Sequence, residues 1–95
     1  MIERHITFNV HADRTADFER FFVETYAVAM SQAPGFVRVE LLREAGSQVR
    51  YQMSFRFESV EASAGWRTAP VHQALQPELT ALFSTNEIVG YDVIA

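Results

Sequence analysis

The chain has 95 residues, 48% of them hydrophobic, and a formal net charge of -4 at pH 7. This length predicts one domain over residues 1–95, and the absence of a basic stripe argues against nucleic acid or a membrane surface as a partner. There is no cysteine and every basic residue is arginine, which excludes disulfides, thiolate nucleophiles, cysteine zinc sites and Schiff-base lysines.

The N-terminal residues 1–5 lack an apolar signal core, and no apolar run approaches the length of a membrane span. We therefore expect a cytoplasmic protein.

The first predicted element is a strand over residues 2–11, where apolar and polar side chains alternate. One face carries Ile6, Phe8 and Val10; the other carries His5, Thr7, Asn9 and His11.

A long helix is predicted next, over about 14–33, with N-cap chemistry from Asp13-Arg14-Thr15 and a stop at Pro34. Its predicted apolar stripe comprises Phe18, Phe21, Phe22, Thr25, Val28 and Ala29.

Two strands come next, over 36–44 and about 48–58, joined by a hairpin at Ala45-Gly46-Ser47-Gln48. In the first of them, one face is expected to carry Val37, Val39 and Leu41, and the other Phe36, Arg38, Glu40 and Leu42. The second has Val49, Tyr51, Met53, Phe55 and Phe57 on one face and Arg50, Gln52, Ser54 and Arg56 on its reverse.

The last third predicts two short helices and a strand. Ser59 caps a helix that runs through Arg67, and Pro70 suits the first turn of the next helix, which Pro77 kinks or interrupts. The final strand is expected over 87–94.

The order β-α-β-β-α-β predicts an α+β, ferredoxin-like fold: an antiparallel four-stranded sheet with helices on one face. The uncovered face would mix apolar and charged side chains. A second sheet packed on it would bury Phe36 and Leu42 and pair Arg38, Arg50 or Arg56 with Glu40, so we expect a homodimer with facing sheets.

Several segments together resemble the antibiotic biosynthesis monooxygenase family. They are Phe18-Glu19-Arg20-Phe21-Phe22, Pro34-Gly35-Phe36-Val37, Leu41-Leu42-Arg43, Tyr51 to Phe57 with Glu58-Ser59, and Trp66-Arg67-Thr68-Ala69-Pro70-Val71-His72. The resemblance spans about residues 5–94 and implies a dimeric α+β barrel. It also implies an oxygenase that acts on phenols or quinols without metal or flavin.

A haem-degrading branch of that family pairs a first-strand asparagine with a helix tryptophan and a histidine about ten residues later. Trp66 matches the tryptophan, but Gln76 stands at the histidine position and Ile6 at the asparagine position. The resemblance therefore favours a reaction without haem, and we expect no cofactor and no metal.

His72 and Trp66 are the candidate catalytic residues. Near neutral pH an imidazole accepts the proton of a phenol, and the resulting electron-rich anion reacts with oxygen directly. Trp66 offers a planar substrate a stacking surface and an indole N–H. The structural alternative is a histidine satisfied by a backbone carbonyl or water, and a tryptophan that anchors the core or an interface.

Five further residues are candidate substrate contacts: Tyr51, Met53, Phe55, Phe22 and Arg67. The three strand residues would line the space between sheet and helices, although aromatics at strand spacing usually form core. Arg67 would hold a carboxylate or phenolate, unless it faces water as most helix arginines do.

The sequence thus predicts a cofactor-independent monooxygenase for a small aromatic phenol or quinol. The alternative from another functional class is a non-catalytic dimeric binding or stress-associated module, whose helix–sheet space is filled by its own side chains. Haem binding is the third and least favoured hypothesis.

Overall fold

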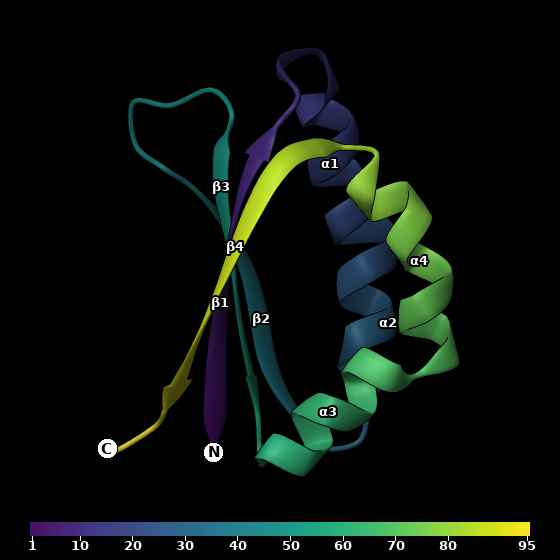
Figure 1. The fold of residues 1–95 in the computed structure, drawn as a ribbon, viewed down its shortest axis with the longest axis vertical. Helices are drawn as coiled ribbons and strands as arrows, with labels where there is room; N and C mark the ends of the chain where they lie inside the picture. Colours follow the sequence, from purple (N-terminus) through teal and green to yellow (C-terminus); the bar gives the residue numbers. More distant parts are fainter.

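A four-stranded antiparallel sheet with the strand order β2-β3-β1-β4 forms one layer of the protein, and the helices lie against one of its faces (Figure 1). The computed structural model describes residues 1–95. The strands are β1 (Ile2–Val10), β2 (Phe36–Arg43), β3 (Arg50–Phe57) and β4 (Phe83–Asp92). This arrangement confirms the predicted ferredoxin-like fold, although β4 begins four residues earlier than expected.

The helical layer consists of η1 (Ala12–Arg14), α1 (Thr15–Phe21), η2 (Phe22–Tyr26), α2 (Ala27–Ser31), α3 (Val60–Thr68) and α4 (Pro70–Thr80). Ser59 caps α3 as predicted, since its side chain accepts from the Ala62 N–H at 3.0 Å. The cap predicted at Asp13-Arg14-Thr15 is wrong: those residues belong to a 3-10 turn and the start of α1, and no side chain caps either element. Pro77 lies inside α4 without ending it.

The first long helix contains one turn that is wider than an α-helical turn. In η2, a π-helical segment, the Ala27 N–H bonds to the carbonyl of Phe22, five residues back. Tyr26, the last residue of this turn, and Met30, one turn beyond it, lie in the core, where they are 2% and 0% exposed. The predicted stripe is therefore wrong at Thr25 and Val28, which are both exposed.

A bulge in β2 changes which face Phe36 occupies. Phe36 pairs with Phe57 and Arg38 pairs with Arg56, so Val37 is an extra residue with no partner on β3. The Phe36 ring packs edge-on against Phe57 on the helix side, with ring centroids 6.0 Å apart. The prediction that Phe36 lies on the uncovered face is therefore wrong, whereas Arg38 remains there.

The turn before β2 is fixed by a close approach to α3. Gly35 has a φ of +80°, and a Cβ placed on it would lie 2.5 Å from the Cβ of Ala62. The Gly35 carbonyl also accepts from the Glu58 N–H at 2.8 Å. A glycine at this position thus lets α3 pack directly over the beginning of β2.

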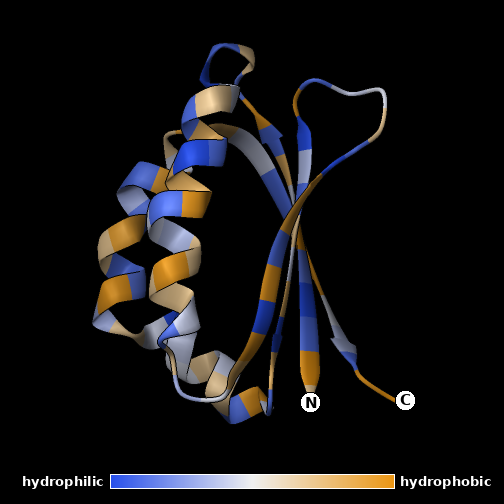
Figure 2. Cartoon of the chain, turned by 180° about the vertical axis from the view of Figure 1, so that it is seen from behind, coloured by the Kyte–Doolittle hydropathy of each residue, from blue (hydrophilic) through white to orange (hydrophobic).

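The core lies between the sheet and the helices. Its largest fully buried side chains are Phe8, Phe18, Met30, Met53, Phe57 and Leu82. Figure 2 shows the corresponding alternation of hydrophobic and hydrophilic residues along the strands. No helix combines the length and the apolar character that crossing a membrane requires.

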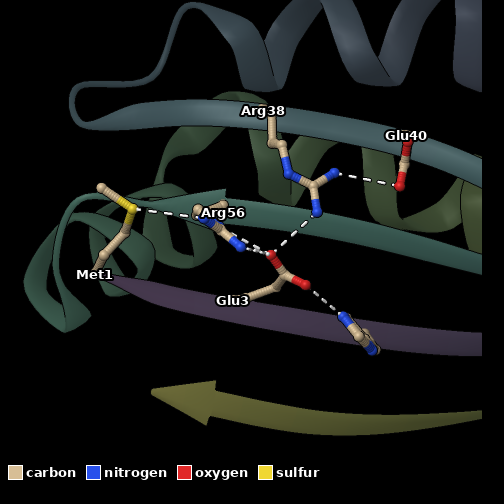
Figure 3. Close-up of polar contacts among 6 residues, drawn as sticks. Met1, Glu3, Arg38, Glu40 and Arg56 are labelled. Carbon is tan, nitrogen blue, oxygen red and sulfur yellow. Dashed lines mark hydrogen bonds and ion pairs between the residues drawn. The ribbon is translucent and has the colours of Figure 1, made fainter. Parts of the chain in front are cut away.

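The uncovered sheet face carries an ion cluster around Glu3 (Figure 3). The Glu3 carboxylate lies 2.7 Å from Arg56 Nη2, 3.1 Å from Arg38 Nη2 and 2.7 Å from His5 Nε2. These contacts lower the pKa of Glu3 from its ordinary 4.5 to about 2, with the hydrogen bond from His5 contributing most.

The arginines of this face therefore find partners within the chain. Arg50 lies 3.4 Å from Glu44, and Arg38 reaches Glu40 at 3.3 Å as well as Glu3. A second sheet is therefore not required to supply counter-charges to these arginines, although we expected it to pair one of them with Glu40.

Candidate functional site

A cavity of about 530 Å³ lies between the helix pair α3–α4 and the strands β1 and β4. This volume falls in the range typical of small-molecule sites. Half of its sixteen lining residues are hydrophobic. Strand pairing sets its floor, because Ile6 faces Ile88 and Phe8 faces Asn86, and all four side chains line the cavity.

Trp66 and His72 lie together at the wall of this cavity. The break between α3 and α4 comes at Ala69, whose extended backbone (ψ 141°) separates the two helices, and Pro70 starts α4. Across this break the two rings meet edge-on, with centroids 4.9 Å apart and planes at 76°. Trp66 is 3% exposed and His72 is half-buried.

Tyr26 is the third ring of this group, and the sequence interpretation missed it. Its ring centroid lies 5.7 Å from that of Trp66 and 6.4 Å from that of His72. Burial raises the pKa of Tyr26 to about 12, although the Trp66 side chain opposes the shift. The phenol therefore stays protonated at neutral pH and can only exchange hydrogen bonds with a ligand.

His72 is poised as a neutral imidazole. Burial lowers the pKa of His72 below its ordinary 6.5. The backbone of Arg67 raises this pKa, whereas the positive charge of the Arg67 side chain lowers it further. Its Nε2 lies 3.2 Å from the amide nitrogen of Gln76, so Nε2 accepts that hydrogen bond and Nδ1 carries the proton. Nδ1 is buried and makes no well-formed hydrogen bond. The basic nitrogen is thus Nε2.

The polar side of the cavity is built from α3, α4 and both strands. Arg4 donates from Nε to the hydroxyl of buried Ser63 at 3.1 Å. Arg67 lines the cavity from the exposed side of α3, and Gln73 and Asn86 add neutral amides. No aspartate or glutamate lines the cavity.

The seven predicted site residues fall into two groups. Trp66, His72, Phe55 and Arg67 line the cavity together. Phe22, Tyr51 and Met53 are buried in the core but do not line it. A role for these three in binding substrate stays a prediction to which the cavity adds no support.

Tyr51 has a different set of contacts. Its ring packs on Phe18, with centroids 5.1 Å apart, and its hydroxyl donates to the Glu19 carboxylate at 2.5 Å. Burial, together with this carboxylate, raises the pKa of Tyr51, while Arg43 opposes the shift.

Two other lining residues were open to detection from the sequence. Arg4 lies two and four residues before Ile6 and Phe8, so it shares their face of the first strand. A buried strand face is an unusual place for a charged side chain. Tyr26 continues the four-residue spacing of Phe18 and Phe22. Asn86 could not be assigned to the cavity from the sequence, because the last strand was expected to begin after it.

The chain contains no group of three or more histidine, cysteine, aspartate or glutamate side chains that could hold a metal ion.

Comparisons with known proteins agree with this architecture. A family model described as antibiotic biosynthesis monooxygenase matches residues 1–78. SnoaB, a cofactor-independent oxygenase from Streptomyces nogalater, is 28% identical, with 99% of this chain and 93% of that chain covered and a TM-score of 0.86. A comparison with curated proteins finds no match.

Two more distant structures share the fold. A conserved protein from Methanosarcina mazei Go1 is 12% identical, with 95% of this chain and 89% of that chain covered and a TM-score of 0.86. A mutant of MhuD, with two manganese protoporphyrin IX bound per active site, is 23% identical; 100% of this chain and 96% of that chain are covered, with a TM-score of 0.83.

Proposed function

Since this chain belongs to the antibiotic biosynthesis monooxygenase family, we propose that it is a cofactor-independent monooxygenase of a small aromatic phenol or quinol, with the cavity beside Trp66 and His72 as its active site. The observation that carries the proposal is that His72, a half-buried imidazole whose pKa is lowered by burial, lines a ligand-sized cavity together with Trp66 and Tyr26. The similarity to SnoaB, a cofactor-independent oxygenase at 28% identity, supports the same chemistry.

His72 is the base of the proposed reaction. Its Nε2 accepts the phenolic proton after the substrate hydroxyl displaces the Gln76 amide, which leaves an electron-rich phenolate. The phenolate carbon reacts with dioxygen, and one oxygen atom stays on the ring as a quinone carbonyl. The other oxygen atom leaves as water with the two hydrogens of the substrate. The substrate supplies all four electrons that reduce dioxygen to the carbonyl oxygen and water, so the reaction needs no further reductant.

The aromatic wall would hold the substrate ring. Trp66, Tyr26 and Phe55 contribute apolar area from three different elements, and aromatic rings pack favourably against a planar ligand. An apolar wall also limits water around the phenolate, which favours its reaction with oxygen over reprotonation.

Oxygen uptake tests the proposal. The assay measures consumption with a panel of dihydroxynaphthalenes, corrected for uncatalysed oxidation, and traces incorporation of one atom from ¹⁸O₂ into the product. His72→Ala is expected to lower the rate about 100-fold or more, the usual contribution of a positioned general base. Arg20→Gln is the matched control, since Arg20 is 61% exposed and lies outside the cavity lining.

Unchanged turnover in His72→Ala removes this residue from the mechanism. No uptake by the wild type with any member of the panel, together with tight binding of the same compounds, indicates a non-catalytic binding module instead.

Haem is a poor fit to these residues. The MhuD mutant binds manganese protoporphyrin, but His72 is the only imidazole in the cavity of this chain. Gln76, which stands at the position of the haem branch's histidine, also lines the cavity, and a glutamine amide is a poor ligand for haem iron. We expect no shift of the Soret band when hemin is added, and a saturable shift would contradict this.

We also propose that two copies pack through the uncovered sheet face. Leu42, Val89 and Tyr91 leave apolar surface exposed on the face that carries the Glu3 cluster. Light scattering at micromolar concentration is expected to give twice the mass of one chain, and a monomer would contradict the proposal.

A further inference from the structure

Two arginines of this chain differ from the other six. Arg14, Arg20, Arg38, Arg43, Arg50 and Arg56 each lie within 3.8 Å of a carboxylate of the same chain. Arg4 and Arg67 have no such partner, and both line the cavity, where no acidic residue is present. In a protein of net charge -4, the proposed active site is therefore positively charged.

Arg4 is held in place for binding. Its Nε donates to Ser63, which is 4% exposed, and Gly90 lies opposite it on β4. Gly90 places no side chain beside Nη1, where an added Cβ would lie in van der Waals contact at 3.9 Å. The two terminal nitrogens make no hydrogen bond within the chain and remain free to donate. A planar guanidinium with two free nitrogens is well suited to bind both oxygens of a carboxylate.

The other residues that line the cavity carry no negative charge that would compete with an anionic ligand for the arginines. Gln73, Gln76 and Asn86 are neutral, and His72 is neutral near pH 7 because burial lowers its pKa. Arg67 is exposed and lines the same cavity from α3. An anionic ligand would therefore meet two unpaired cations and no fixed negative charge.

We infer that the aromatic ligand of this cavity carries a carboxylate, bound by Arg4 and assisted by Arg67, with Ser63 as the residue that positions Arg4. The inference rests on the proposed function, because it takes the cavity as the substrate site. A carboxylate is favoured over a phenolate, because a carboxylic acid is already ionised near pH 7. The phenol instead arrives protonated and gives its proton to His72.

Calorimetric titration with two matched probes tests the inference. Anthraquinone-2-carboxylate and anthraquinone-2-carboxamide have the same shape and differ in charge. The wild type is expected to bind the carboxylate about tenfold or more tightly than the carboxamide, as a charge-assisted pair implies. In Arg4→Gln this preference is expected to fall to about twofold or less, with carboxamide affinity little changed.

Three further variants define the site. Arg67→Gln is expected to lose part of the preference, and Ser63→Ala to lose part of it while the charge of Arg4 is retained. Arg20→Gln removes one positive charge outside the cavity lining and is expected to keep the full preference. Far-UV circular dichroism of each variant checks that the fold is intact, and Arg67→Gln provides an exposed site where folding is not at stake.

Equal affinity of the wild type for both probes overturns the inference, as does an equal loss of preference in Arg20→Gln. No binding of either probe overturns it too. The outcome is separable from that of the proposed function, since oxygen uptake is measured independently. A carboxylate preference that depends on Arg4, without oxygen uptake, would leave the inference standing and remove the oxygenase.

Discussion

His72 presents its imidazole edge-on to the indole of Trp66, with ring centroids 4.9 Å apart, across the break between α3 and α4. Trp66 is the only tryptophan of the chain, so its fluorescence reports on the immediate surroundings of His72.

The activity should depend on the neutral form of His72. Burial lowers its pKa below 6.5, so the base is present above that pKa and is lost as the pH falls through it. The rate of oxygen uptake is therefore expected to be level near pH 7 and to fall with a midpoint below 6.5. The fluorescence of Trp66 is expected to titrate with the same midpoint. A midpoint above 6.5 in both measurements would contradict a buried, neutral base.

Replacing Arg67 should move this midpoint in a known direction. The positive charge of Arg67 disfavours the imidazolium, so its removal in Arg67→Gln is expected to raise the pKa of His72. The acid limb of the profile would then shift to higher pH. Arg20→Gln, at a residue outside the cavity lining, is expected to leave the limb in place, and equal shifts in both variants would point to a general effect of net charge.

Two glycines with similar backbone angles should respond differently to alanine. Gly46 has φ +84° and open space around it, so Gly46→Ala is expected to cost about 1–2 kcal/mol of unfolding free energy from backbone strain alone. Gly35→Ala adds a collision with Ala62 and is expected to cost about 3 kcal/mol or more. Urea denaturation with unchanged slope measures both. Equal losses would mean that α3 moves away without penalty.

The Glu3 cluster should make stability depend on acid pH. The folded-state pKa of Glu3 is about 2 against an ordinary 4.5, so its stabilisation is present above 4.5 and disappears as the pH falls toward 2. Allowing for solvent screening of the cluster in a single chain, Glu3→Gln is expected to cost about 1–2 kcal/mol at pH 7. The cost should vanish near pH 2.

Glu40→Gln is the matched control for that experiment. Glu40 lies 3.3 Å from Arg38 but its side chain is 53% exposed, so its loss is expected to cost less than about 0.5 kcal/mol. If Glu3→Gln costs as little, the cluster does not stabilise the fold.

The order of elements could be predicted from the sequence because alternation and helical spacing are local properties. The cap at Ser59, the proline at the start of α4 and the dry face of β1 all needed only a few neighbouring residues. Trp66 and His72 could be placed together because a single break separates them along the chain.

The remaining features depend on contacts between distant segments. The expectation for Phe36 failed because the bulge at Val37 is defined by pairing with β3. Tyr51 and Met53 share a strand face with Phe55, yet only Phe55 lies where β1, α3 and α4 leave a space. Which aromatic residues become core and which become cavity wall is therefore decided by the packing of the helices, a relation that no single segment encodes.

The wide turn in η2 and the bulge at Val37 have one consequence in common. Each absorbs one surplus residue and leaves the rest of its helix or strand in register, so Met30 still faces the core and Arg38 the uncovered sheet face. A relative lacking either irregularity would be one residue shorter at that point. When this chain is aligned with such relatives, the gaps belong inside the first long helix and inside β2. Gaps moved into the neighbouring loops would misalign the residues in between, including Tyr26 of the cavity wall.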